Sequence, residues 1–151
     1  MVQHTKKIII GRKDIADFPL LNIYNLPVKI DSGAYTSSLH CHNIVEFEEN
    51  DIKKIKCNLL DPSHANYHEK EFIFDTFSKK KVKSSNGQVE ERYKIKTEIK
   101  LFNQIYPIEL TLSERGSMRF SVLLGRKFLT KKFLIDTSLT NLSYKNSIIT
   151  I

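Results

Sequence analysis

The sequence is poor in tryptophan, cysteine, proline and glycine residues and has no long apolar run. It has no tryptophan, two cysteines, four prolines and five glycines in 151 residues. No apolar run approaches the roughly 20 residues that a helix needs to cross a bilayer, and the polar first seven residues lack the apolar centre of a signal peptide. These absences predict a cytoplasmic protein with no membrane partner. Cys41 and Cys57 are then expected to be free thiols in a reducing compartment.

The local motifs of metal and nucleotide sites are missing as well. The chain contains no His-Glu-x-x-His motif and no glycine-rich phosphate loop. His40 and His42 flank Cys41 and would point the same way on a strand, which could begin a zinc site. The other candidate ligands are Cys57, His64 and His68. They supply no clear third ligand, so we expect no metal and no cofactor.

The charge balance is basic. Lysine and arginine total 24 against 17 aspartates and glutamates, a formal net charge of +7. Such a surface raises the local concentration of anionic partners, but most of the lysines are scattered, and solubility explains them. The lysine-rich run at 79–83 is interpreted as an exposed loop or hairpin arm.

What the sequence does contain is a series of short β-favouring runs. In the longest, at 89–102, Tyr93, Ile95, Thr97, Ile99 and Leu101 alternate with polar neighbours, which is typical of a half-buried strand. Shorter runs predict further strands at 7–11, 26–30, 52–60, 71–77, 104–112, 121–124 and 133–135.

The segments between these runs carry turn signals. Asn86-Gly87 is the strongest hairpin signal, and Asn103-Gln104 indicates a further turn. Residues 126–132 favour one short helix, and we find no internal repeat or linker. The pattern predicts an all-β fold, a small closed barrel, in a single domain over residues 1–151.

Two separated motifs carry the chemistry. The β run that ends at Ile30 is followed by Asp31, Ser32 and Gly33, an ordinary turn signature when taken alone. In a functional interpretation, Asp31 activates water, the Ser32 hydroxyl holds the loop, and Gly33 lets two backbones approach closely. Downstream, the apolar run that ends at Leu124 is followed by Gly125 and Arg126. In that order the pair of motifs is fairly specific.

With these motifs the chain resembles the bacterial retropepsin-like aspartic peptidases labelled "ATP-dependent zinc protease", which are associated with RimK-type ATP-grasp ligases. The resemblance covers nearly the whole chain and is carried by residues 10–14, 29–40, 82–87, 90–93, 110–112 and 123–126, with Arg115 and Met118. Three residues depart from the family pattern. Ser32 stands for threonine, Tyr35 for an arginine and Asp14 for a glutamate.

The resemblance implies a retropepsin-like barrel with a flap hairpin at residues 82–93. It implies an aspartic endopeptidase in which Asp31, Ser32 and Gly33 are catalytic. The implied substrate contacts are Ala34, Asn86, Gly87 and Arg92, and the implied supports of the site are Leu124, Gly125 and Arg126. Arg126 is expected to act through an ion pair, and Glu91 to form an exposed cross-strand charge pair.

Such a peptidase needs two carboxylates that share one proton, and this chain has one Asp-Ser-Gly motif. A homodimer would supply the second copy. Asp136-Thr137-Ser138 is an internal candidate, but Ser138 replaces the glycine and the chain is short for two lobes. The expected partners are a second copy, a peptide substrate such as a tail added by the ligase, and a RimK-type ATP-grasp ligase.

Two other functions remain open. The chain could be a catalytically silent module of the same fold that binds a peptide or a partner, accessory to an ATP-grasp ligase. It could also be a basic β-barrel that binds nucleic acid. This last interpretation ranks lowest, because the aromatic residues fall mostly on predicted core positions and not on an exposed stacking face. We therefore expect no nucleic-acid partner.

Overall fold

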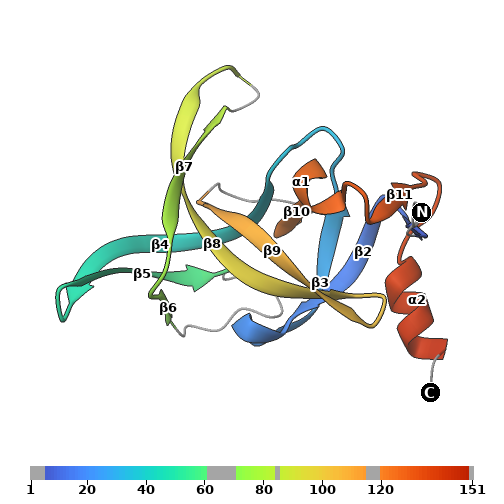
Figure 1. Ribbon diagram of the computed structural model, residues 1–151, viewed down its shortest axis with the longest axis horizontal. Helices are drawn as coiled ribbons and strands as arrows, with labels where there is room; N and C mark the ends of the chain where they lie inside the picture. The colour runs from blue at the N-terminus through green and yellow to red at the C-terminus, as the bar shows by residue number, and fades with distance from the viewer. Residues whose placement is uncertain (1–5, 61–70, 84–85, 115–119, 150–151) are drawn as a thin grey trace, which may run out of the picture.

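The computed structural model describes residues 6–60, 71–83, 86–114 and 120–149, and it is built mainly of strands (Figure 1). The strands are β1 (Ile8–Ile10), β2 (Lys13–Phe18), β3 (Ile23–Ile30), β4 (Ser37–Glu49), β5 (Ile52–Leu59), β6 (Glu71–Phe74), β7 (Ser78–Lys83), β8 (Val89–Leu101), β9 (Gln104–Ser113), β10 (Val122–Leu124) and β11 (Phe133–Ile135). The helical elements are the 3-10 turn η1 (Pro19–Leu21), α1 (Arg126–Leu129) and α2 (Leu142–Ile149). None of the helices described here has the length and apolar character needed to cross a membrane.

The main sheet closes on itself. Its neighbours run β10-β3-β2-β8-β9-β4, and β10 also pairs with β4, which completes a ring. The pairing between β2 and β8 is short, and its paired residues are Asp17 and Lys100. Inside lie the fully buried aliphatic side chains, among them Leu26, Leu39, Ile99, Leu110 and Leu124. Closure satisfies the strand edges, and it confirms the predicted all-β, retropepsin-like barrel.

Two hairpins project from the ring (Figure 1). The β4–β5 arm extends to one side, while the β7–β8 hairpin rises above the barrel and matches the predicted flap. Its two strands pair from Ser78 opposite Lys94 to Lys83 opposite Val89, so the hairpin begins earlier than position 82. Gly87, near its tip, has a φ of 85°, a conformation that glycine adopts without strain.

The strands that the sequence did not predict have weak hydrophobic patterns. The buried positions of β2 include Asp14 and Ala16, which carry little apolar signal. At its start, β4 is buried on both faces over residues 37–41 and therefore shows no period-two alternation. The turn between β8 and β9 lies at Phe102 and Asn103, one residue earlier than expected, and both residues have positive φ.

The two cysteines lie side by side in the core. Cys41 on β4 and Cys57 on β5 are both buried and are free thiols, as expected. A hydrogen bond from one thiol to the other, together with burial, raises the pKa of Cys41 far above its usual range. Cys41 is therefore a packing residue and not a reactive thiol.

Candidate active site

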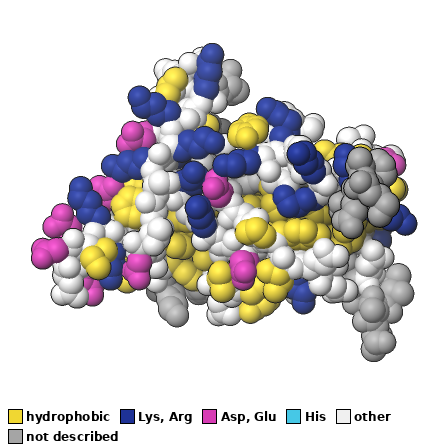
Figure 2. Space-filling model, in the orientation of Figure 1, with side chains coloured by type: hydrophobic (Ala, Val, Ile, Leu, Met, Phe, Trp, Pro, Cys, Tyr) yellow, Lys and Arg dark blue, Asp and Glu magenta, His cyan; other side chains and the backbone are white. Residues whose placement is uncertain are grey.

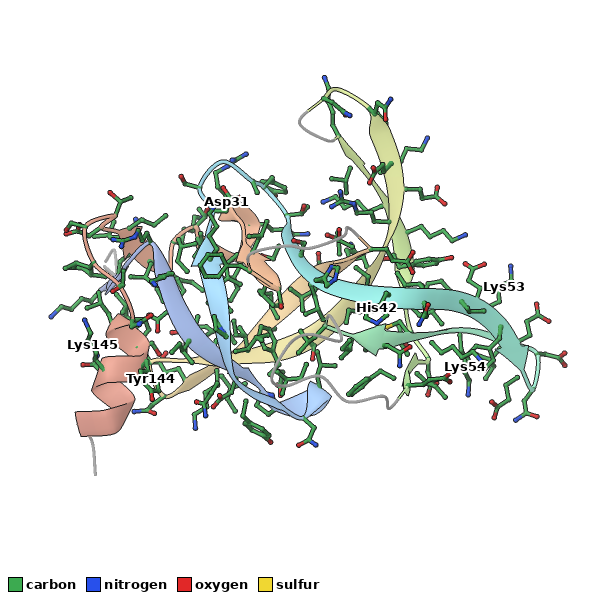
Figure 3. The ribbon with its side chains drawn as sticks, turned by 180° about the vertical axis from the view of Figure 1, so that it is seen from behind. Asp31, His42, Lys53, Lys54, Tyr144 and Lys145 are labelled. Atoms are coloured by element: carbon green, nitrogen blue, oxygen red, sulfur yellow. The ribbon has the colours of Figure 1, made fainter. Side chains whose placement is uncertain are left out.

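The Asp31 loop begins where β3 leaves the ring (Figure 3). The Asp31 N–H donates to the carbonyl of Leu124 at 2.9 Å, and the Ala34 N–H donates to the Asp31 carbonyl at 3.2 Å. The side-chain Oδ1 of Asp31 accepts the Gly33 N–H at 3.0 Å. The carboxylate is half-buried and is held in one orientation by its own loop.

Gly125 and Arg126 brace this loop from the other side. Leu124 pairs with Ile30 in parallel register, which places Gly125 directly behind the loop. A Cβ at position 125 would lie 2.6 Å from the carbonyl oxygen of Thr36, so the backbones meet more closely than a side chain would allow. The Gly125 N–H donates to the buried Ser37 Oγ at 3.0 Å.

Arg126 contacts the loop with both its backbone and its side chain. Its N–H donates to the Ala34 carbonyl at 2.8 Å, and its Nη1 donates to the Ser32 carbonyl at 2.8 Å. Among the described residues the side-chain partner of Arg126 is thus a backbone carbonyl, and the expected ion pair stays a prediction. The guanidinium stabilises the loop conformation by donating a charge-assisted hydrogen bond to a backbone carbonyl oxygen.

Tyr35, one of the three residues that depart from the family pattern, links the loop to the flap hairpin. The residue is 53% exposed. The Lys80 Nζ of β7 lies 5.4 Å from the ring centroid, and the Arg126 Cζ lies 5.8 Å from it. Two cation–π contacts of this kind each contribute about 0.5–1 kcal/mol at exposed sites.

A cavity of about 540 Å³ lies between the Asp31 loop and the β7–β8 hairpin. The loop contributes Gly33 and Ala34 to its wall, and β8 contributes Arg92. Asn86 and Gly87 do not line it and lie exposed near the hairpin tip. The sequence interpretation did not assign to the site the cavity residues Tyr35, Thr36, Ser38, Lys80, Lys81 and Leu123, whereas Val82 and Lys83 lie in the predicted flap. The lysine run at 79–83 was the available signal, read only as an exposed arm.

The charged residues of the hairpin divide into two roles. The Arg92 side chain is only 12% exposed, and Glu90 holds it through Nε at 3.3 Å and Nη2 at 3.2 Å. Glu91 faces Lys79 across the hairpin, with Nζ 3.9 Å from Oε1. Glu91 thus forms the exposed cross-strand pair that was expected, while Arg92 is oriented toward the cavity.

A second loop, which begins at Asp136, has the same pattern of hydrogen bonds as the Asp31 loop. At the end of β11, the Asp136 N–H donates to the Ile10 carbonyl at 2.9 Å, just as Asp31 donates to Leu124. Asp136 Oδ1 accepts the Ser138 N–H at 3.0 Å, as Asp31 Oδ1 accepts the Gly33 N–H. Ile10 and Leu124 are each followed by Gly-Arg-Lys.

The brace is repeated as well. The Arg12 N–H donates to the Leu139 carbonyl at 2.9 Å, and its Nη1 donates to the Thr137 carbonyl at 3.3 Å, the positions that Arg126 contacts in the other loop. The sequence interpretation of no internal repeat was therefore wrong. Four residues of similarity are too short to stand out without the matching hydrogen bonds.

The two loops differ in the chemistry of their carboxylates. Ser138 Oγ donates to Asp136 Oδ1 at 2.6 Å, and this bond lowers the pKa of Asp136 below its usual range. Among the described residues, Asp136, Asp31 and Ser32 do not line the cavity, but Gly33 and Ala34 of the Asp31 loop do. A carboxylate held in its charged form is poorly suited to share a proton, so we assign Asp136 to the loop structure.

The histidines and cysteines form no metal centre in the part of the chain that the structure describes. The rings of His40 and His42 lie 6.3 Å apart, and no group of three His, Cys, Asp or Glu side chains gathers among these residues. His64 and His68 lie outside the described residues.

Comparison with known proteins agrees with this geometry. Residues 9–146 match the model of the RimB-like family, described as retropepsin-like aspartic endopeptidase RimB. The chain belongs to the RimB-like family. The resemblance noted from its motifs is thereby confirmed.

The relatives of this RimB-like chain include longer proteins. It is 36% identical over 136 residues to a probable alpha-L-glutamate ligase of Shewanella halifaxensis, and 32% identical over 136 residues to one of Parasynechococcus marenigrum. Each match covers 87% of this chain but only 29% and 28% of the relative, so the chain spans less than a third of their length.

A solved structure shares the fold. A Legionella pneumophila protein of unknown function (DUF785) superposes with a TM-score of 0.72 at 26% identity. The match covers 91% of this chain and 99% of that one.

Proposed function

We propose that this chain is a single-domain, cytoplasmic aspartic endopeptidase that acts as a homodimer. The observation that carries the proposal is the braced Asp31 loop, whose next residues, Gly33 and Ala34, form a wall of the 540 Å³ cavity. A carboxylate held rigidly beside a cavity large enough for a peptide is suited to activating water.

The mechanism follows from pairing two Asp31 carboxylates across a two-fold axis. Two close carboxylates retain one proton between them, because both cannot easily be ionised. The ionised carboxylate accepts a proton from a water molecule while the oxygen of that water attacks the scissile carbonyl carbon. The protonated group donates a hydrogen bond to the carbonyl oxygen, and a proton then passes to the leaving amine as the C–N bond breaks.

The walls of the cavity favour an acidic substrate. Lys80, Lys81, Lys83 and Arg92 line it, and among the described residues no aspartate or glutamate does. The relatives named as glutamate ligases suggest a source for such a peptide. We infer that the chain cleaves glutamate-rich tails and that an ATP-grasp ligase of the RimK type is its functional partner.

The test compares wild type with Asp31→Asn on a peptide of glutamates, with products followed by mass spectrometry. We expect Asp31→Asn to lose at least about 10²-fold in kcat, because it removes the acid and base together. Asp136→Asn is the matched control, since it alters the equivalent carboxylate of the repeated loop, and it should cleave at the wild-type rate.

A catalytically silent module that binds acidic peptides is the second candidate, and the same basic cavity supports it. Wild-type protein that is dimeric, binds the peptide and yet leaves it intact would favour this module over the peptidase. Equal activity in wild type and Asp31→Asn would remove Asp31 from the mechanism.

A further inference from the structure

A second cavity opens next to the first. It has a volume of about 330 Å³ and shares Thr36 and Lys80 with the cavity beside Asp31, so the two are neighbours. Most of its wall residues come from β8, β9 and α1. The charged residues around it are Lys80, Lys94, Lys96, Lys127, Lys132 and Glu109.

Glu109 organises two of these lysines. Its Oε2 lies 2.7 Å from the Lys127 Nζ of α1 and 3.5 Å from the Lys94 Nζ of β8. The hydrogen bond from Lys127 lowers the pKa of Glu109, so this carboxylate is ionised at neutral pH. A single negative charge therefore fixes two cations and leaves the cavity with an excess of positive charge.

The other walls combine apolar surface with further cations. Ile108 and Phe128 are buried side chains that form apolar wall, and Lys132 lies over the Phe128 ring with its Nζ 5.0 Å from the centroid. Lys96 is exposed and stands opposite Glu109 in the β8–β9 register. Figure 2 shows this face, where Lys and Arg side chains gather between the β7–β8 hairpin and α1.

Apolar wall with cations around it fits a short aliphatic side chain that ends in a carboxylate. The methylenes of such a side chain contact the apolar wall while the carboxylate meets lysines. We propose that this cavity is a second subsite, which binds an acidic side chain of a peptide that also occupies the cavity beside Asp31. The identity of that peptide rests on the proposed function, whereas the subsite rests on the residues of the cavity.

An acidic peptide suits the cavity better than a single-stranded nucleic acid. Binding of unpaired bases relies on exposed aromatic faces. The aromatic side chain of this cavity, Phe128, is 5% exposed, and its ring packs against Tyr106 and Phe133 at 5.9 and 5.8 Å.

The experiment measures binding of a fluorescent hexaglutamate by anisotropy, with Asp31→Asn as the background so that the peptide stays intact. Adding Lys96→Glu should raise Kd by about threefold to tenfold, because one exposed attraction is lost and a repulsion replaces it. A second variant, Lys96→Gln, should give a smaller loss in the same direction.

Lys100→Glu is the matched control. Lys100 is exposed, lies on the same strand and the same face as Lys96, and does not line the cavity. Four residues of strand separate the two lysines by about 13 Å, beyond the Debye length of about 8 Å at physiological ionic strength. Lys100→Glu should therefore change Kd by less than about twofold, although it changes the net charge equally.

Equal losses for Lys96→Glu and Lys100→Glu would overturn the subsite, because only general attraction would then be at work. A single-stranded oligonucleotide that competes as well as the peptide, with the same dependence on Lys96, would overturn the assignment to a peptide.

Cleavage by the protein with Asp31 intact separates the two proposals. Binding that depends on Lys96 without any cleavage would uphold the subsite and reject the peptidase. Cleavage with an unchanged KM in Lys96→Glu would do the reverse.

Discussion

Gly125 has no side chain, and this allows its backbone to pack closely against the Asp31 loop. A Cβ there would lie 2.6 Å from the Thr36 carbonyl oxygen and 2.7 Å from that of Tyr35. Both neighbours are backbone atoms that also accept hydrogen bonds or precede buried Ser37, so they have little room to move. The need for glycine at this position is steric, and it does not arise from an unusual φ.

Gly125→Ala should therefore lower the free energy of unfolding by about 3 kcal/mol, the upper range for overpacking. Urea unfolding monitored by circular dichroism measures this loss. Gly87→Ala is the control, because nothing lies within 4 Å of the added Cβ and only the positive φ is unfavourable. Its expected loss is about 1 kcal/mol. Equal losses at the two positions would contradict the steric account.

At the scale of elements, α2 depends on a residue from the opposite end of the chain. Asp14 on β2 is 1% exposed. Its Oδ2 accepts the Ser143 N–H at 2.9 Å, and its Oδ1 accepts the Tyr144 N–H at 3.2 Å. These are amides of the first turn of α2, so Asp14 stabilises the helix as a capping residue would, and the helix N-terminus balances its charge.

Asp14→Ala should destabilise the protein by about 2 kcal/mol, since it leaves two amides of α2 without this acceptor. Hydrogen exchange should speed up at Ser143 and Tyr144 more than in β8 or β9. Asp17→Ala is matched on the same strand, where Asp17 Oδ1 accepts the exposed Asn25 N–H at 2.8 Å. We expect it to cost less than about 1 kcal/mol. Unchanged exchange in α2 of Asp14→Ala would contradict the capping role.

At the scale of the whole molecule, the proposed chemistry requires two copies of the chain. One braced Asp31 loop is present, and its structural counterpart, Asp136, is held in the ionised form by Ser138. The repeat within the chain therefore supplies a second loop without a second proton-sharing carboxylate. A two-fold dimer would supply it.

Light scattering over a concentration series should show a species of twice the 17.6 kDa mass of the chain. Asp31→Ala should dimerise as well, because the loop backbone bonds do not need the carboxylate. A strict monomer at high concentration would leave Asp31 without its mate and would favour the binding module.

Much of the fold could be predicted from local patterns. The alternation around Ile95 and Ile99 predicted β8, and Asn86-Gly87 predicted the flap hairpin, because strands and tight turns are specified by neighbouring residues. The helix α2 could not be predicted, because its start depends on Asp14, 129 residues from Ser143.

For the candidate site, the Asp31 loop, its Gly125-Arg126 brace and the basic charge of the chain could be predicted from the order of residues alone. These are properties of residue type and order, which persist however the strands are arranged. Folding in three dimensions was needed to show which lysines face the cavities, how Arg126 contacts the loop, and that Gly11 and Arg12 brace the Asp136 loop. Each of these contacts joins segments that are distant in the chain, and ring closure of the sheet sets their distances.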